Sequence, residues 1–375
     1  MKKILYYTAR DMTNPSLGIN KKIRNQIETL RKSFYVDAVY RKNDDQLVLE
    51  KNSGKEIILV SGMKRPYKVQ ESRYLAKFLK KHSYEGCYIR YVFADGQFYK
   101  SLKEMAKADT RVILEIPTYP YDEEMLDSLE NRIVLFLDRM YRNRMKPYVD
   151  KIATYSCDRE IYGIPAFQVI NGVNFENIPL AVHPEQDTCI RMIAVADLAK
   201  WHGYDRLLRG IGEYYRKNGD REIHFYMVGQ GKELELYQEI VREYGIEDKV
   251  TFCGSLYGED LDKIYDKCTL AVECLGAHRK GLKLSSSLKS REYAAKGLPM
   301  ITSVEIDVFD VQDYPYICMF QGNEEPIDLE KVIQFYDSIY VGNNCNSVAA
   351  AIREYAQGLC DMDVVMKPVV DCYKE

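Results

Sequence analysis

Lys289 and Glu292 are the residues of this sequence with the clearest chemical potential. They stand three positions apart at the start of a short expected helix, so both side chains lie on one face of it. Serines at 285–287 precede the helix, and serine hydroxyls satisfy the free backbone N–H groups of a helix start. This combination suits a charged ligand that carries several hydroxyl groups. An ordinary amphipathic helix with two exposed charges would show the same spacing, so both interpretations stay open.

Strands and helices alternate along both halves of the chain, which predicts α/β domains with parallel sheets covered by helices. In the first half we expect strands at 4–8, 34–40, 87–91, 112–116, 151–155 and 167–170, a hairpin near 48–60, and helices at 18–32, 71–81, 97–107 and 123–146. In the second half we expect strands at 191–196, 223–228, 249–253, 270–273 and 300–303, and helices at 204–217, 232–244, 259–267, 348–355 and 364–373. Parallel sheets bind ligands at the carboxyl ends of their strands, so the loops that follow the strands should carry the chemistry.

The composition predicts a two-domain protein of the reducing cytoplasm. With 375 residues, the chain is about twice as long as a typical domain. Its 10 cysteines include no C-x-x-C pair and no signal-like segment stands at the start, which favours free thiols in a reducing compartment. No run of 18 apolar residues is present, so we expect no membrane-spanning segment.

Charge is distributed unevenly between the two halves. Residues 1–175 contain 31 Lys and Arg against 22 Asp and Glu, whereas the remainder contains 22 against 34. A basic first domain fits an anionic surface or a phosphate-bearing acceptor, although chance drift gives the same imbalance. Apolar residues at 133–137 are followed by basic residues at 139–146, a pattern that suits a helix at a membrane interface. The dipole of an ordinary helix also favours cations at the C-terminus, so a helix without membrane contact remains the alternative.

Several motifs resemble those of a known family. Lys-x-x-Glu-Tyr-x-Ala-x-Gly-x-Pro at 289–299 resembles nucleotide-sugar glycosyltransferases of the GT-B fold, family 4 in particular. Asn-Gly-Val-Asn at 171–174, Val-Gly-x-Gly at 228–231 and Val-x-Phe-x-Gly at 250–254 resemble further motifs of that family, in the family's order. The resemblance covers roughly residues 1–305 and is strongest in the second half.

The resemblance implies two Rossmann-like, doubly wound domains that face a cleft. Residues 1–172 would bind the acceptor, residues 173–355 would bind the nucleotide sugar, and a helix at 356–375 would cross back to the first domain. In such enzymes the residue matching Glu292 binds the ribose hydroxyls, and the residue matching Lys289 lies near the diphosphate.

The sequence departs from the family pattern at three positions. Asp197 and His202 stand where an Arg and a Lys usually hold the diphosphate, and Leu284 stands where a second Glu usually contacts the sugar. Cationic donors are still needed beside a leaving diphosphate. Lys200, His202 and Arg206 are the local candidates, unless the segment is a plain surface loop with its tryptophan packed on the core.

Other sites are predicted less specifically. Gly18 begins a helix after the first strand, and a helix N-terminus is a ready anion site. Glu115 and Asp122 lie in a Pro-rich segment after a strand and are candidates for a general base, although a rigid connector would look alike. The basic loop at 276–283 is expected to close over a diphosphate or an anionic sugar, or else to be a solvated run of charges.

The resemblance implies a glycosyltransferase of the bacterial capsular or exopolysaccharide type that transfers a sugar with retention. It implies no metal and no cofactor besides the nucleotide-diphosphate sugar as co-substrate. The acceptor would be a glycan or a polyprenyl-diphosphate-linked hydroxyl at the inner membrane face, and no nucleic acid is expected as a partner. A nucleotide-sugar 2-epimerase and a non-catalytic nucleotide-sugar-binding protein are the alternatives.

The candidate site residues follow from these motifs. The catalytic candidates are Glu115, Lys200, His202 and Lys289, and the candidate nucleotide-sugar contacts are Gly18, Trp201, Arg206, Gly229, Leu256, Tyr257, Ser286, Ser287, Leu288 and Glu292.

Overall fold

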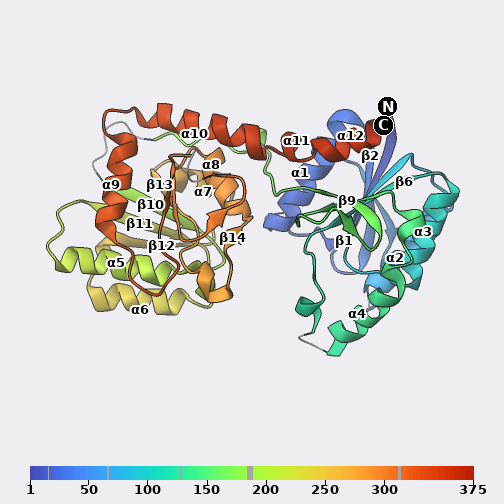
Figure 1. Cartoon of the computed structure of the whole chain (residues 1–375), viewed down its shortest axis with the longest axis horizontal. Helices are drawn as coiled ribbons and strands as arrows, with labels where there is room; N and C mark the ends of the chain where they lie inside the picture. Colours follow the sequence, from blue (N-terminus) through green and yellow to red (C-terminus); the bar gives the residue numbers. More distant parts are fainter. Residues whose placement is uncertain (16, 66, 127–128, 184–188, 311–313) are drawn as a thin grey trace. The chain divides into compact units, whose positions relative to one another are not determined.

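The chain forms two units, each built around its own sheet (Figure 1). A computed structural model describes residues 1–375 apart from 16, 66, 127–128, 184–188 and 311–313. The first unit contains Met1–Ile170 and Met362–Glu375, and the second contains Asn171–Asp361. The sequence places the start of the returning segment at 356. In the structure it starts at Met362, because helix α10 (Cys345–Cys360) still belongs to the second unit.

The described part of the first unit contains a nine-stranded sheet in the order β4-β3-β2-β1-β5-β6-β7-β9-β8. Its strands are β1 (Lys3–Asp11), β2 (Tyr35–Lys42), β3 (Gln46–Glu50), β4 (Glu56–Val60), β5 (Gly86–Arg90), β6 (Arg111–Ile116), β7 (Lys151–Thr154), β8 (Glu160–Ile161) and β9 (Ile164–Gln168). Its helices are α1 (Gly18–Ser33), α2 (Tyr67–Leu79), α3 (Gly96–Lys107), α4 (Leu129–Arg142), α11 (Met362–Val365) and α12 (Lys367–Lys374), with short 3-10 helices η1 (Glu123–Met125) and η2 (Lys146–Tyr148). The central strands pair in parallel, and hairpins add β3, β4 and β8 at the edges.

Helices cover both faces of this sheet, which explains the unbroken apolar run of β1. Ile4 and Tyr6 point to the face covered by α1, α11 and α12, whereas Leu5 and Tyr7 point to the face covered by α2, α3 and α4 (Figure 1). Successive side chains of a strand point to opposite faces, so a strand buried on both sides is apolar throughout.

The long helix expected at 123–146 is interrupted in the structure. The described parts are η1, α4 and η2, and residues 127–128 lie outside the described residues. After α4 the chain turns, which buries Met145 completely, and Pro147 stands at the start of η2, where a proline is tolerated. Within the described ranges, no helix has the length and apolar character needed to span a membrane.

The described part of the second unit has six parallel strands in the order β12-β11-β10-β13-β15-β17. They are β10 (Ile190–Val195), β11 (Ile223–Val228), β12 (Val250–Gly254), β13 (Leu270–Val272), β15 (Met300–Thr302) and β17 (Ile317–Met319), and a separate pair is β14 (Leu284–Ser285) with β16 (Glu305–Ile306). The helices are α5 (Tyr204–Arg216), α6 (Leu234–Tyr244), α7 (Gly258–Tyr265), α8 (Leu288–Ala295), α9 (Leu329–Tyr340) and α10, with 3-10 helices η3 (Phe175–Asn177), η4 (Lys200–His202), η5 (Glu247–Lys249) and η6 (Ala277–Lys280).

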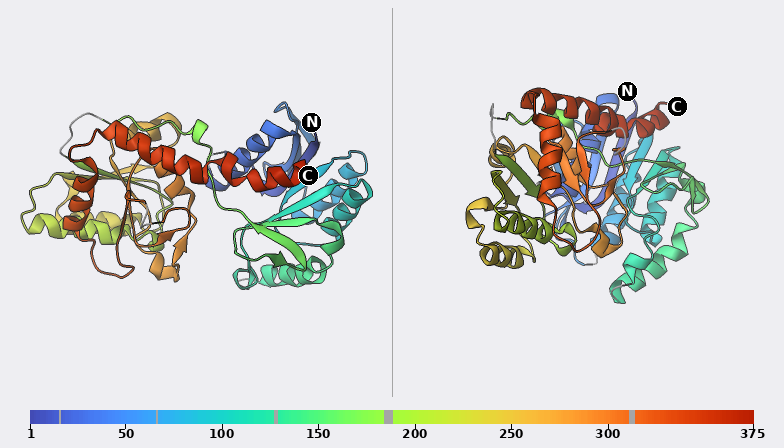
Figure 2. Two further views of the ribbon diagram at one scale, coloured as in Figure 1. Left: turned by 45° about the horizontal axis from the view of Figure 1, so that its top comes forward. Right: turned by 60° about the vertical axis from the view of Figure 1, so that its left-hand side comes forward.

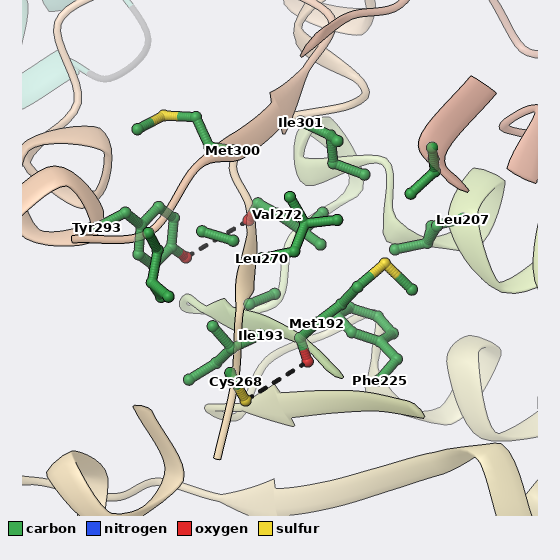
Figure 3. Packing of buried hydrophobic residues seen from close by; sticks show 14 of the residues in the cluster. Met192, Ile193, Leu207, Phe225, Cys268, Leu270, Val272, Tyr293, Met300 and Ile301 are labelled. Carbon is green, nitrogen blue, oxygen red and sulfur yellow. Dashed lines mark hydrogen bonds between the residues drawn. The ribbon is translucent and has the colours of Figure 1, made fainter. Parts of the chain in front are cut away.

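The order in which strands are added to this sheet changes direction between β10 and β13, although all six strands are parallel. The chain first builds β10, β11 and β12 towards one edge, then crosses to build β13, β15 and β17 towards the other. The connections that follow β10 and β13 therefore lead to opposite edges of the sheet, and the carboxyl ends of two such adjacent strands are the usual ligand position in open α/β sheets. The core beneath contains Met192, Phe225 and Leu270 (Figure 3). The α/β architecture predicted from the sequence is confirmed.

The C-terminal segment completes the core of the first unit. Tyr373 of α12 is fully buried and packs edge-on against Phe34, with ring centroids 5.9 Å apart. Val369 of the same helix is also buried. Both ends of the chain consequently lie on the first unit (Figure 2).

We expect Tyr373→Ala to destabilise the first unit by about 3 kcal/mol, because it removes a buried aromatic ring and leaves a cavity. Urea unfolding followed by circular dichroism should show this loss. The fluorescence transition of Trp201, which lies in the second unit, should stay in place. Val364→Ala on α11, where the side chain is 43% exposed, serves as the control and should change neither transition. Equal behaviour of the two variants would show that α12 does not stabilise the first unit.

Candidate functional site

The loops after β10 and β13 touch through their backbones. Gly203 has φ +68°, and a Cβ on it would lie 2.4 Å from the backbone N of Gly276. Beside this contact, the Leu275 N–H donates to the carbonyl of His202 at 2.7 Å. Only glycine allows this approach, so the two glycines fix the geometry at the reversal point of the sheet.

Helix α8 starts at the same place and is fixed by a buried tyrosine. Ser287 is the N-cap residue, and its hydroxyl accepts from the Ser290 N–H at 3.3 Å. The hydroxyl of Tyr293 accepts from the Val195 N–H at 2.9 Å. It donates to the Val272 carbonyl at 3.4 Å (Figure 3). Tyr293 therefore connects α8 to the ends of both β10 and β13.

Three buried polar groups without hydrogen-bond partners meet beside α8. The ammonium of Lys289 lies 3.9 Å from a carboxylate oxygen of Glu273 and 6.0 Å from the ring centroid of Tyr204. Among the described residues, Lys289 Nζ, Glu273 Oε2 and the Tyr204 hydroxyl have no hydrogen-bond partner, and all three atoms are buried. Buried polar groups are nearly always satisfied, so this cluster is suited to bind a ligand with anionic and hydroxyl groups.

Glu273 was not among the residues singled out from the sequence. It is 1% exposed, and its other oxygen accepts from the Ser287 hydroxyl. The signal available in the sequence was its position directly after β13, where the strand reaches the ligand-binding edge.

His202 faces this cluster as a neutral ring. Burial lowers its pKa to about 3, and the charges of Lys289 and Lys280 contribute in the same direction. The Ala199 N–H donates to Nδ1 at 3.3 Å, which leaves the proton on Nε2. The sequence interpretation of His202 as a cationic donor is therefore corrected: at neutral pH it offers one N–H donor and no charge.

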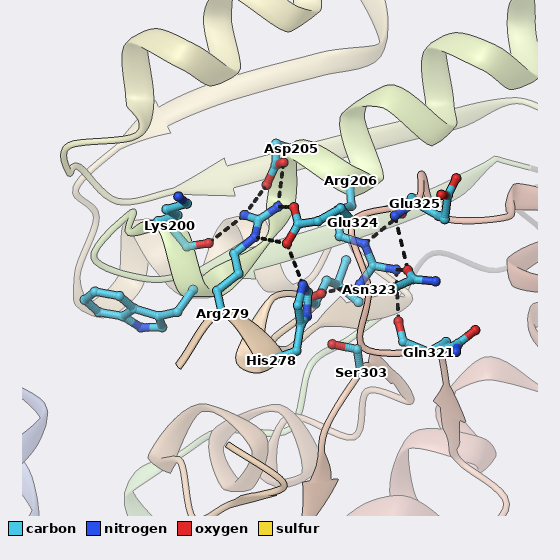
Figure 4. Close-up of polar contacts among 12 residues, drawn as sticks. Lys200, Asp205, Arg206, His278, Arg279, Ser303, Gln321, Asn323, Glu324 and Glu325 are labelled. Atoms are coloured by element: carbon cyan, nitrogen blue, oxygen red, sulfur yellow. Dashed lines mark hydrogen bonds and ion pairs between the residues drawn. The ribbon is translucent and has the colours of Figure 1, made fainter. Parts of the chain in front are cut away.

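Arg206 has a structural environment. Its side chain is buried, and its guanidinium donates to the carbonyls of Leu275, Gln321 and Glu325, the last two at 3.0 and 2.7 Å (Figure 4). Because these acceptors and Asn323 occupy its donors, the geometry argues against Arg206 as a diphosphate ligand. Its role is to hold the loop after β17 against the loop after β13.

Arg279 of the basic loop is also fully engaged. It donates to both oxygens of Asp205 at 2.8 and 2.9 Å, to both oxygens of Glu324 at 3.0 and 2.6 Å, and to the Lys200 carbonyl at 2.7 Å (Figure 4). These contacts argue against Arg279 closing over an anion. They tie η4, α5 and η6 together beside the cluster.

The outer rim of the site carries the remaining candidates of this loop. Trp201 is 38% exposed, and the ammonium of Lys280 lies 3.3 Å from its ring centroid. The side chain of Lys200 is exposed. Solvent reaches these groups, so they would contact a ligand only at the outer edge of the cluster formed by Lys289, Glu273 and Tyr204.

The Gly-x-Gly segment after β11 is explained first by packing. A Cβ on Gly229 would lie 1.8 Å from the Ala196 carbonyl oxygen, and a Cβ on Gly231 would lie 2.1 Å from that of Leu198. The glycines thus let the loop after β11 lie against the loop after β10. Leu256 and Tyr257 follow β12 at the same edge of the sheet, where Leu256 is half-buried and Tyr257 is exposed.

The serine turn before α8 is held by a buried arginine. Arg291 donates to the Ser287 carbonyl at 3.0 Å and to the Asn171 carbonyl at 3.1 Å, and it pairs with Asp307. The Asn171 side chain donates to the Ser286 carbonyl at 2.7 Å. Ser286, Ser287 and Leu288 are therefore brought together at the start of α8, and the half-buried Glu292 lies one turn further along.

The second unit matches a known family. Residues 190–314 match the model of the family described as Glycosyl transferases group 1. Mannosylfructose-phosphate synthase from Agrobacterium fabrum is 26% identical over 145 residues, which cover 37% of this chain and 30% of that protein. The chain therefore matches less than a third of the length of this curated relative.

Solved structures match along the whole chain. Sucrose-phosphate synthase from Thermosynechococcus elongatus has a TM-score of 0.64 at 15% identity, with 100% of this chain and 98% of that chain covered. WaaG, a glycosyltransferase involved in lipopolysaccharide biosynthesis, has a TM-score of 0.59 at 12% identity, with 99% of each chain covered. The chain has the GT-B fold.

In the first unit of this GT-B chain, Glu115 is a buried, paired anion. It pairs with Arg90 and Lys22 and accepts from Tyr88 at 2.9 Å and Gln26 at 3.0 Å. Burial alone would raise its pKa, but the charges of Arg90 and Lys22 outweigh it and bring the pKa to about 2. A fully buried carboxylate with this pKa is a poor proton acceptor, so the environment argues against Glu115 as a general base.

The other first-unit candidates have simpler surroundings. Asp122 pairs with Arg142 at 2.6 Å and with Arg139 at 2.7 Å, and these two arginines lower its pKa. Gly18 is the exposed first residue of α1, whose N-cap residue Leu17 provides no side-chain cap.

Replacing Gly203 by alanine should distort the reversal point of the GT-B second unit. The positive φ costs about 1 kcal/mol, and the collision with Gly276 should add about 1–3 kcal/mol. Gly281→Ala is the matched control, because Gly281 has φ +65° and open space around a Cβ. Thermal unfolding followed by Trp201 fluorescence should separate the two variants, and equal losses would contradict the close contact.

The low pKa of His202 predicts a specific pH dependence of stability. The folded state favours the neutral ring. The contribution of His202 to the unfolding free energy is therefore fully present above the unfolded pKa of about 6.5, and it is lost as pH falls towards the folded pKa of about 3. Between these values the unfolding free energy of the native protein should change by up to about 1.4 kcal/mol per pH unit more than that of His202→Gln. Urea unfolding at several pH values measures this difference. Parallel curves would show that His202 is not held neutral.

Proposed function

We propose that the protein is a glycosyltransferase that moves a sugar from a nucleotide-diphosphate sugar to an acceptor hydroxyl. The observation that carries the proposal is the buried Lys289 ammonium at the start of α8, which lies 3.9 Å from Glu273 and has no hydrogen-bond partner among the described residues. This cluster lies inside the segment that matches group 1 glycosyl transferases. It lies also at the reversal point of a parallel sheet, where nucleotides bind in related architectures.

The nucleotide diphosphate would lie across the start of α8. The first backbone N–H groups of the helix and the Lys289 ammonium would bind the phosphates. His202 would donate its Nε2–H to a phosphate oxygen, and Lys200 would add charge at the rim. These donors stabilise the charge that develops on the leaving diphosphate.

The nucleoside would extend from α8 along the edge of the sheet. Glu292 would accept hydrogen bonds from the ribose hydroxyls, and backbone groups of Leu256 and Tyr257 would contact the base. Glu273 would accept from a hydroxyl of the sugar or the ribose.

The proposed reaction retains the anomeric configuration. The acceptor oxygen forms a bond to the anomeric carbon on the face from which the diphosphate departs, and the bond from that carbon to the phosphate oxygen breaks. The acceptor proton passes to the departing diphosphate oxygen. The step needs neither a protein base nor a metal, and the only co-substrate is the nucleotide sugar.

The proposed acceptor is a glycan or a polyprenyl-diphosphate-linked sugar in surface polysaccharide assembly, of the capsular or exopolysaccharide kind. The basic first half of the chain supports a phosphate-bearing acceptor. WaaG, which has a similar fold, is described as involved in lipopolysaccharide biosynthesis. We place the protein in the cytoplasm, in peripheral contact with the inner membrane face.

A donor screen combined with two α8 variants tests the proposal. UDP, GDP, ADP, dTDP and CMP sugars are compared by thermal shift, and the true donor should stabilise the native protein at saturation. Glu292→Gln should weaken binding of that donor about tenfold or more, because it removes a charged acceptor. Lys289→Met should lower kcat/KM for sugar transfer about 100-fold, because it removes charge stabilisation of the leaving group.

The matched control is Lys217→Met, since that lysine is 79% exposed at the end of α5. It should bind and turn over the donor like the native protein. Absence of any donor-dependent shift would contradict the donor site. Donor binding without transfer or hydrolysis would identify a binding protein instead, and release of free nucleotide without an acceptor would favour the epimerase.

A further inference from the structure

One face of α4 in the first unit is apolar and exposed. Leu129, Ile133, Phe136 and Met140 are 76%, 56%, 65% and 43% exposed, respectively. Their spacing of four, three and four residues places them on a single stripe of the helix. Single exposed apolar residues are common on proteins, but a continuous stripe on one helix marks an interaction surface.

The opposite face already anchors α4 to its unit. Leu135 is buried in the core, and the Asp138 carboxylate accepts from the Ala94 N–H at 2.7 Å and from the Tyr121 hydroxyl at 2.6 Å. Arg142 lies on the same side and pairs with Asp138 at 3.3 Å. The face of α4 that packs on the unit is therefore already in contact with it, and the exposed stripe is a separate face of the helix.

Basic side chains surround the stripe. Arg132 and Arg139 flank it on α4 itself, although Arg139 also pairs with Asp122. Helices α2 and α3 cover the same face of the sheet as α4 (Figure 1, Figure 2). On α2, α3 and the residue that follows α2, the exposed basic residues are Arg73, Lys77, Lys80, Lys100, Lys103 and Lys107.

Acidic residues offset little of the charge of α2 and α3, whereas the sequence also places Glu130 on α4 and Asp122, Glu123 and Glu124 shortly before it. On α2 and α3 the acidic residues are Glu71, which is fully buried, and Glu104, which pairs with Lys107 at 2.8 Å. The exterior formed by α2, α3 and α4 therefore combines an apolar stripe with a positive surface, which we call the α4 surface.

We propose that the α4 surface binds an anionic lipid bilayer, with the apolar stripe of α4 inserted at the level of the headgroups. An amphipathic helix binds in this way through its apolar area, and basic residues near the membrane surface add attraction to anionic lipids. The flanking arginines can extend their charged ends to the headgroups while their stems cover apolar surface. This inference specifies the surface that makes the membrane contact proposed above, and it does not depend on the donor site.

A second copy of the chain fits the α4 surface less well. A symmetric dimer through α4 would place the same patch on both partners, and the basic residues of α2 and α3 would then face their own copies. Such like charges repel each other, whereas an anionic bilayer attracts them. The charge around the stripe therefore favours lipid.

Vesicle flotation of the full chain tests this inference. Phosphatidylcholine vesicles that contain about one-third phosphatidylglycerol are compared with pure phosphatidylcholine vesicles. The native protein should float with the anionic vesicles and not with the neutral ones. The double substitution Ile133→Glu with Phe136→Glu should lower the partition coefficient about 100-fold, because it replaces inserted apolar groups by charges. Lys77→Gln with Lys103→Gln should lower it about tenfold and should weaken its dependence on salt.

The matched control is Leu236→Glu with Val341→Glu, which removes two exposed apolar residues of the second unit and changes the net charge equally. It should float like the native protein. The thermal shift given by the nucleotide-sugar donor should be equal in the native protein and the α4 variant, which separates this test from that of the donor site.

Three results would overturn the inference: no flotation of the native protein, equal flotation with neutral vesicles, or equal flotation of the α4 variant and its control. Sedimentation velocity adds one more. A native dimer that the α4 variant converts to a monomer would identify the surface as an interface between copies.

Discussion

The backbone contact between Gly203 and Gly276 is the constraint on which the site depends. It joins the loops after β10 and β13, whose strands mark the reversal of the sheet. Two independent interactions hold the same contact: Arg279 bridges Asp205 and Glu324, and Tyr293 connects α8 to the ends of both strands (Figure 4). The start of α8 is consequently fixed before any ligand binds, which is the preorganisation that electrostatic stabilisation of a leaving group requires.

The contacts that hold these loops together engage basic side chains that a motif comparison would predict to bind the diphosphate. Arg206 and Arg279 have their guanidinium groups satisfied by carbonyls and carboxylates of the second unit. His202 is neutral because it is buried beside Lys289 and Lys280. Lys289 is the buried cation of this cluster that has no hydrogen-bond partner among the described residues. The positive charge available to an anionic ligand is thus concentrated at the start of α8.

Most of the fold could be predicted from the sequence, because hydrophobic periodicity and strand–helix alternation are local properties. The three-residue strand β17 was missed, since so short a segment carries no recognisable period. The position of α8 was also accessible, because Lys289 and Glu292 lie on one short helix. The roles of Arg206 and Arg279 were not, because their partners stand 115 and 45 positions away and only tertiary structure brings them together. For the same reason the sequence did not reveal the ion pairs of Glu115, whose partners Lys22 and Arg90 stand 93 and 25 positions away from it.

The state of the first-unit carboxylates bears on the chemistry of transfer. Glu115 is buried between Arg90 and Lys22, and Asp122 is held by Arg139 and Arg142. Each is stabilised as an anion by cations, which weakens it as a base because the pKa falls. A reaction in which the acceptor proton passes to the departing diphosphate requires no such base. The pairing of these carboxylates therefore argues against a reaction that depends on Glu115 or Asp122 to activate the acceptor, and the retaining reaction proposed above needs neither of them.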